Sequence, residues 1–252
     1  MLVRLLPLVC LLLSNVLVAA RAMLLQATVK GGGVRLLVDA SCSPPRLFEG
    51  ETESSAAAAA LAAGLAQRSP AAGEEIIEWL ADDSQSVICQ VPRKLAIEHT
   101  LLHRGVGVVI YNSPRRDAVY VHQRSDSKRV FPGLYDMLVG GVSAPGEPSL
   151  DTLRRELSEE VGIELSAAGE ECSYLGRCRV QTSFNFCEVA CFELVCSEAQ
   201  AAGIRFADGE VQWGEWCSLQ RLKQEMLPKF EFVPDGLQVW DWMQREGKLL
   251  AL

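Results

Sequence analysis

The chain has 252 residues and a formal net charge of −8, with 24 lysines and arginines against 32 aspartates and glutamates. This length is enough for one large domain with extensions or for two small domains. The acidic balance and the lack of a basic stripe argue against a nucleic-acid partner. A small phosphate compound stays compatible with it, because a metal ion can screen the phosphate charge locally.

Residues 1–22 have the composition of a targeting segment. Arg4 precedes an apolar run from Leu5 to Ala20, which is short for a membrane-spanning helix and suits the core of a signal peptide. We therefore expect delivery to the secretory pathway or to an organelle, a plastid or a mitochondrion. The alternative is that this run anchors the chain in a membrane. We expect any membrane contact only through this N-terminal segment. If Met23 is the true start, the protein is cytoplasmic.

Residues 23–73 carry a weak pattern. A glycine triplet at 31–33 and an alanine run at 56–60 are typical of a poorly packed extension, which could be disordered. No function follows from this stretch, and we expect the compact domain to occupy residues 74–252.

The domain opens with a predicted strand or hairpin over 74–83 and 86–94. Residues 105–111 and 118–124 are rich in β-branched and aromatic residues around the turn 112–117, which predicts a second hairpin. Further strands are expected at 135–141, 173–181, 185–196 and 210–216, and helices at 219–227 and 234–247. Strands and helices in this order favour an α/β fold.

Residues 141–163 combine a glycine-bounded loop with an acidic helix that enters at Pro148 and leaves at Gly162. Helix geometry puts Glu156, Glu159 and Glu160 within an arc of about 100° on one face. Three carboxylates in that arc repel one another unless a cation lies among them. Hard divalent cations such as Mg²⁺ or Mn²⁺ prefer such oxygen ligands and keep several waters and substrate phosphates. The pattern therefore predicts a metal site.

The spacing of this segment resembles the Nudix box, in which a glycine, a glutamate and an Arg-Glu-aliphatic-any-Glu-Glu core recur at fixed distances. All of the defined positions are matched, by Gly141, Glu147, Arg155, Glu156, Leu157, Glu159, Glu160, Gly162 and Ile163. The likeness extends over roughly residues 74–248. It is closest to the branch near isopentenyl-diphosphate isomerase, through the motifs at 103–104, 123–128 and 131–133. The resemblance implies a Nudix-type α/β/α sandwich with a mixed sheet.

The resemblance also implies a function, the hydrolysis of a diphosphate linkage in a nucleoside diphosphate derivative or related small molecule with the help of Mg²⁺ or Mn²⁺. By position, the metal ligands are Glu156, Glu159, Glu160 and the carbonyl of Gly140. Glu147 and Arg155 are expected to lock the loop against the helix rather than touch the substrate. The substrate itself and the oligomeric state stay open.

Two choices remain open within the predicted site. The general base is Glu159 in the first interpretation and Glu210 in the second, because members of the family differ on this point. Arg104, Arg124 and Lys128 are the candidates for holding substrate phosphates.

Two other functions compete with hydrolysis. An isopentenyl-diphosphate isomerase-like enzyme needs a catalytic cysteine and a metal-binding histidine, and counting from 131–133 puts Gly140 and Val142 at those positions. A non-catalytic nucleotide-binding module usually loses box carboxylates, whereas this chain keeps all of them.

The chain has 9 cysteines without a CxxC pair and only 3 histidines. Zinc sites usually need tighter clusters. Burial of the cysteines as free thiols is the favoured interpretation, and disulfides stay open.

Overall fold

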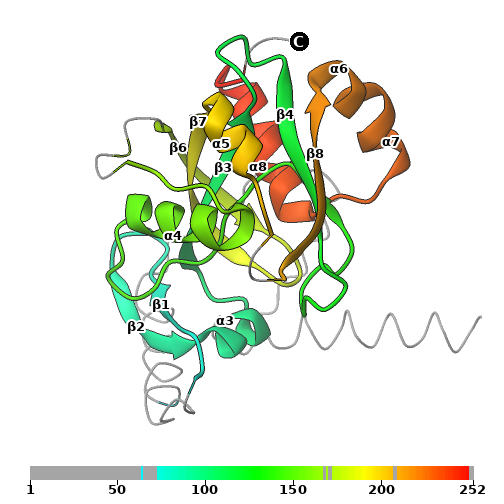
Figure 1. Ribbon diagram of the computed structural model, residues 1–252. Coiled ribbons are helices and arrows are strands. Elements are labelled where there is room, and N and C mark those ends of the chain that lie inside the picture. The colour runs from blue at the N-terminus through cyan, green and yellow to red at the C-terminus, as the bar shows by residue number, and fades with distance from the viewer. Residues whose placement is uncertain (1–63, 65–72, 167–168, 170–171, 207–208, 250–252) are drawn as a thin grey trace, which may run out of the picture. The chain divides into compact units, whose positions relative to one another are not determined.

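The computed structural model describes residues 64, 73–166, 169, 172–206 and 209–249 (Figure 1). Residues 70–252 form one compact unit. The predicted leader, 1–22, lies outside the described residues, as does nearly all of the extension 23–73. Within the described part of the chain, no helix is long and apolar enough to cross a membrane.

A mixed six-stranded sheet forms the centre of this unit (Figure 1). Its strands are β3 (His103–Tyr111), β4 (Ala118–Arg124), β5 (Tyr135–Asp136), β6 (Cys172–Gln181), β7 (Phe186–Val195) and β8 (Val211–Ser218). The order is β5-β4-β3-β7-β6, and β8 pairs with β4. Strands β3 and β7 run parallel along their whole common length, whereas the other pairs are antiparallel. The predicted mixed sheet is thus confirmed.

Helices cover both faces of the sheet because strand side chains alternate between the faces. Helix α4 (Ser149–Val161) packs Leu153, Leu157 and Val161 against one face. Helix α8 (Pro234–Arg245) packs Val239, Trp240 and Met243 against the other face. The two helices lie on opposite sides of the sheet in Figure 1, which confirms the predicted α/β/α arrangement.

A small antiparallel sheet precedes the main one. It consists of β1 (Ile76–Leu80) and β2 (Val87–Pro92), the expected opening hairpin. Helix α3 (Arg93–His99) follows directly, in a place where the sequence suggested the end of a strand. Helix α5 (Glu198–Gly203), which begins at a capping box on Ser197 and Gln200, was also missed.

The predicted turn between β3 and β4 is present, but the two strands do not form the expected run of paired residues. The two strands pair only at Tyr111 and Val119. Residues 139–142 take the edge of β3 instead, because the amides of Val106 and Val108 donate to the carbonyls of Gly141 and Val139. The expected strand at 135–141 is therefore short, and its second half lies beside β3.

The last predicted helices are present, with one irregularity. Residues 219–227 form α6 (Leu219–Arg221) and a π-helical turn η1 (Leu222–Met226), followed by α7 (Leu227–Lys229). Pro228 explains the change, since a proline cannot donate a helical hydrogen bond.

Candidate active site

The loop before α4 is tied to the helix by Arg155. Its guanidinium donates to both carboxylate oxygens of Glu147 (3.2 Å each) and to the carbonyl of Val142 (3.1 Å). Glu147 also accepts from the amide of Ala144 and the hydroxyl of Thr152 (2.9 Å each). Burial pushes the pKa of Glu147 upward, but these hydrogen bonds outweigh it and hold the pKa below its ordinary value. Glu147 is thus an anion that closes the loop.

Glu156 lies against the backbone of the loop. A Cβ built on Gly141 would stand 2.2 Å from a carboxylate oxygen of Glu156, so only glycine leaves room for that carboxylate. Arg155 donates to the same carboxylate at 2.6 Å. Burial raises the pKa of Glu156, and the charge of Arg155 opposes the rise.

Glu160 is the more deeply buried of the two carboxylates, with 4% of its surface exposed. Burial, helped by the charge of Glu156, raises its pKa to about 8. Lys128 and Arg124 act against this rise, while Glu210 adds to it. Charges from three predicted regions of the chain therefore act on Glu160: those of the helix α4, of the segment 124–128 and of Glu210, just before β8.

The two candidates for the general base have different surroundings. Glu159 has a half-exposed side chain and accepts a hydrogen bond from Arg155 at 3.3 Å. Glu210 forms an ion pair with Lys128. Both carboxylates already have a cationic partner.

A cavity of about 150 Å³ lies beside the loop, and Gly140 and Gly141 are part of its wall. A Cβ on Gly140 would stand 2.1 Å from the carbonyl oxygen of Val106. The close pairing of residues 139–142 with β3 thus requires glycine at position 140. Arg124 also lines the cavity.

The carboxylates fit a divalent cation that is completed by water and substrate. Among the described residues, no group of three or more histidine, cysteine or acidic side chains could hold a metal ion by itself. Mg²⁺ does not need such a group, because it commonly binds one or two carboxylates together with waters and phosphates. Glu156 and Glu160 are two desolvated carboxylates whose charges oppose each other, and a cation between them would relieve that repulsion.

The three candidate phosphate-binding residues are separated by the fold. Arg124 lines the cavity and donates to the carbonyl of Val130 at 3.1 Å. Lys128 is near Glu160 and pairs with Glu210. Arg104 instead donates to Glu78 at 2.5 Å and lines a separate hollow. The structure brings the first two to the box helix and leaves Arg104 outside the cavity wall.

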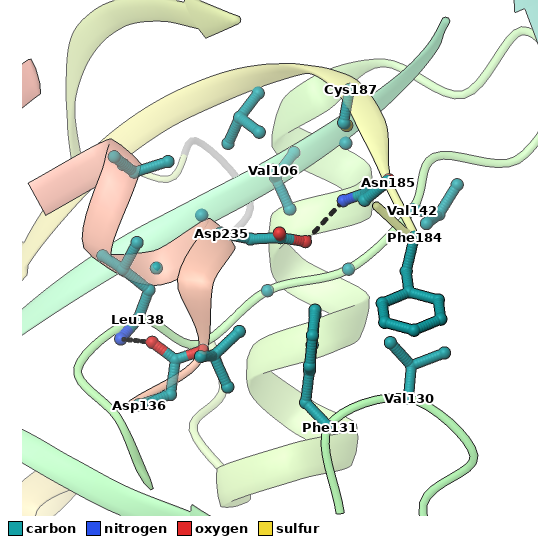
Figure 2. A pocket seen from close by; sticks show the side chains of 18 of the residues that line it. Val106, Val130, Phe131, Asp136, Leu138, Val142, Phe184, Asn185, Cys187 and Asp235 are labelled. Atoms are coloured by element: carbon teal, nitrogen blue, oxygen red, sulfur yellow. Dashed lines mark hydrogen bonds between the residues drawn. The ribbon is translucent and has the colours of Figure 1, made fainter. Parts of the chain in front are cut away.

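Several cavity residues were not found from the sequence. They are Arg93, Phe131, Asp136, Phe184, Asn185 and Asp235, which come from five different segments. Figure 2 shows Asp235 and Asn185 joined by a hydrogen bond and the rings of Phe131 and Phe184 near each other. A sequence signal existed in part, since Phe131 belongs to the motif at 131–133 and Asp235 follows the proline that starts α8.

Known proteins share this sequence pattern and fold. The NUDIX domain family matches residues 101–236. An uncharacterized Nudix hydrolase of Streptomyces coelicolor is 32% identical over 170 residues, which cover 66% of this chain and 87% of that protein. One of Rhodococcus erythropolis is 29% identical over 157 residues, which cover 62% of this chain and 84% of that protein.

A solved structure shows the same fold. A Deinococcus radiodurans protein superposes with a TM-score of 0.53 at 23% identity, covering 68% of this chain and 98% of that one. The family match spans more than half of the chain and includes the whole box, the loop and most of the cavity wall. The chain therefore belongs to the Nudix hydrolase family.

Proposed function

We propose that this chain is a metal-dependent hydrolase that cleaves a diphosphate linkage in a nucleoside diphosphate derivative or a related small molecule. The observation that carries the proposal is the burial of Glu156 and Glu160 together at the loop of Gly141, beside a cavity. Membership of the Nudix hydrolases supports hydrolysis of pyrophosphate bonds.

The proposed metal ligands are the carboxylates of Glu156 and Glu160 and the carbonyl of Gly140, with Glu159 at the rim of the same helix face. A bound Mg²⁺ or Mn²⁺ would neutralise charge on the diphosphate and make a water molecule more acidic. The Arg155–Glu147 contacts keep the helix face and the loop in register. Arg124 and Lys128 add positive charge where the phosphates would lie.

For the general base we keep Glu159 as the first candidate and Glu210 as the second. Glu159 is half exposed, so a proton taken from water can leave to solvent. Glu210 would first have to give up its ion pair with Lys128. A general base lost by substitution lowers kcat by about 10²–10⁴-fold. Glu159→Gln and Glu210→Gln are compared at saturating metal, so that a weakened metal ligand at position 159 does not imitate a lost base.

Three features of the chain favour hydrolysis over the alternatives. The isomerase position for a catalytic cysteine is Gly140, where even a Cβ would collide with the backbone of β3. Val142 stands where the isomerase needs a metal-binding histidine. A purely nucleotide-binding module would have no use for the buried pair Glu156 and Glu160.

The test is a screen of the full-length chain against nucleoside diphosphates, nucleoside triphosphates, nucleotide sugars, dinucleotides, coenzyme A and isoprenoid diphosphates. Products are followed by ³¹P NMR with Mg²⁺, with Mn²⁺ and with excess chelator. We expect phosphate or a nucleoside monophosphate from at least one class, only when metal is present. Turnover that survives the chelator would refute the metal-assisted mechanism.

A substitution at the box helix sharpens this test. Glu160→Gln keeps the shape and removes one charge, so kcat should fall by about 10²-fold or more, on the scale of other preorganised electrostatic contacts. Glu164→Gln, at an exposed position just beyond α4, is the matched control and should keep wild-type turnover. Equal activity of both variants at saturating metal would remove Glu160 from the proposed ligands.

A further inference from the structure

The cavity beside the loop is small, open to solvent on one side, and lined by both apolar and polar side chains. Its volume is about 150 Å³, and its apolar wall consists mainly of valine and leucine side chains from β3, β7, α8 and the segment after β5. A closed apolar cavity of about this volume holds benzene. Because this cavity is open on one side, a larger flat ring system can enter it and extend out of it, so the cavity suits a flat ring rather than a long flexible group.

One polar atom in the wall has no partner at ordinary hydrogen-bond length. Oδ1 of Asp235 is buried and has no hydrogen bond of ordinary length in the described part of the protein, while Oδ2 accepts from the side-chain amide of Asn185 at 2.6 Å. The hydroxyl of Thr182 is near enough to lower the pKa of this carboxyl, although burial raises that pKa overall. Figure 2 shows this carboxylate reaching into the cavity from the start of α8. A buried acceptor without a donor costs free energy, and a ligand that brings an N–H or O–H group would remove the cost.

The charges around the cavity decide what kind of donor fits. Arg93 and Arg124 line the same wall, and their positive charges disfavour an ammonium ligand. Asp136 offers a second carboxyl group there, of which one oxygen accepts from the amide of Leu138 at 3.0 Å. The mixture of arginine and aspartate side chains in the wall therefore favours a ligand whose hydrogen-bond donor carries no charge.

Two phenylalanines stand where a planar ring could stack. Phe131 and Phe184 both line the cavity and meet edge to face with their centroids 5.8 Å apart. Phe184 keeps 51% of its surface exposed, which is a large exposed fraction for an aromatic side chain. Aromatic faces of this kind bind nucleobases by stacking.

We propose that this cavity binds the base of the substrate and selects a ring that carries an amino group, with Oδ1 of Asp235 accepting the N–H and Phe184 stacking on the ring. The inference rests on the proposed function for the other end of the substrate, since Gly140 and Gly141 belong to the same wall. It narrows the substrate class to amino-bearing nucleoside diphosphate derivatives over their oxo-bearing counterparts.

The first test uses pairs of nucleosides that differ in this one group. Adenosine is compared with inosine and cytidine with uridine, by NMR titration of the full-length protein without metal. We expect the amino-bearing member of at least one pair to bind about tenfold more tightly. The exocyclic amino group can donate to Asp235, whereas the oxo group at the same position is a second acceptor and leaves only the neighbouring ring N–H to donate. Equal affinities within both pairs would overturn the proposal.

The second test changes the acceptor. Asp235→Asn presents either an amide oxygen or an N–H donor, so the preference for the amino group should fall to less than about twofold or reverse. Circular dichroism and the melting temperature establish that the variant is folded. A folded variant that keeps the full wild-type preference for the amino-bearing nucleoside would show that Asp235 does not accept a hydrogen bond from the ring's amino group.

A third variant covers the case in which Asp235→Asn does not fold. Phe184→Ala should weaken all four nucleosides by about the same factor, several-fold or more, and leave the amino preference intact. Phe230→Ala is the matched control, because Phe230 is similarly exposed (44%) and lies outside the cavity wall. If Phe184→Ala and Phe230→Ala bind all four nucleosides as the wild type does, the stacking assignment fails.

Kinetics with the matched diphosphates separate this inference from the proposed function. Hydrolysis of ADP and IDP, and of CDP and UDP, at equal rates would refute the base selection and leave the hydrolase proposal standing. Selective nucleoside binding without hydrolysis of any diphosphate would refute the hydrolase proposal and support the assignment of the cavity.

Discussion

At the scale of single residues, Asp136 shows how strongly burial sets the chemistry of this cavity. Its side chain is 7% exposed, and burial raises its pKa to about 7 against an ordinary value of 3.8. Hydrogen bonds from the amides of Leu138 and Met137 and the charge of Arg124 act in the opposite direction, while Asp235 adds to the rise. The folded protein therefore binds a proton here more tightly than the unfolded chain.

This shift makes stability depend on pH with a definite sign. A raised acid pKa means that the contribution of Asp136 is most favourable below about pH 4 and is lost as the pH rises towards about 7. Asp136→Asn cannot ionise and keeps an oxygen for the amide of Leu138. The variant's free energy of unfolding should therefore exceed that of the wild type by a margin that grows between pH 4 and 7. The margin should reach about 2–4 kcal/mol and stay constant at higher pH.

Urea unfolding of both proteins at several pH values measures this difference. Asp241→Asn, at an exposed position on α8, serves as the control and should leave the wild-type profile as it is. Parallel profiles for Asp136→Asn and the wild type would show that Asp136 ionises freely in the folded protein.

At the scale of elements, the loop and α4 work as one unit because of Arg155. Its fork spans Glu147 and the carbonyl of Val142, and it reaches Glu156 at 2.6 Å. The local sequence favours a helix for α4, packing on the sheet stabilises it, and Gly162 ends it in the left-handed conformation with φ 68°. The contacts of Arg155 add to the packing of α4 on the sheet and to the backbone pairing of residues 139–142 with β3 in fixing the distance between the helix and the loop.

Arg155→Lys tests this coupling. Lysine keeps the charge but cannot bridge several acceptors in one plane, so the free energy of unfolding should fall by about 1–3 kcal/mol and kcat/KM by at least about tenfold. The neighbouring Arg154→Lys, whose guanidinium pairs with Asp151 on the outer side of the helix, should change stability by no more than about 0.5 kcal/mol. Similar losses in the two variants would mean that Arg155 is an ordinary surface cation.

At the scale of the whole molecule, the cysteines report on the integrity of the core. Seven described cysteines form no disulfide bond, as the favoured sequence interpretation expected. Five of them are buried, namely Cys178, Cys187, Cys191, Cys196 and Cys217. Burial raises the pKa of each of these thiols, and a thiol without its thiolate form reacts slowly.

A maleimide reagent at pH 7 should therefore distinguish the two groups of thiols. Cys89 and Cys172 are partly exposed and should react in the native protein, whereas the five buried cysteines should react only in denaturant. Peptide mapping by mass spectrometry identifies each site, and hydrolysis should survive the native labelling. Rapid native labelling of Cys191, which lies in the middle of β7 and has 0% of its surface exposed, would mean that the sheet opens far more readily than its packing suggests.

The sequence by itself determined the parts of this protein that depend on local order. The spacing from Gly141 to Ile163 predicted the loop, the helix and its acidic face, because these follow from helical periodicity and from the chemistry of glycine and carboxylates. Alternating or continuous apolar runs located the strands of the main sheet for the same reason. Membership of the Nudix hydrolases followed from the same residues.

Tertiary structure alone decided which distant side chains meet. The pairing of residues 139–142 with β3, in place of a long β3–β4 ladder, shapes the cavity wall. Asn185 and Asp235 are far apart in sequence and share a hydrogen bond. Arg104 lies outside the predicted site and forms an ion pair with Glu78. No local pattern encodes these contacts, because they depend on strand pairing and on how two helices pack against opposite faces of one sheet.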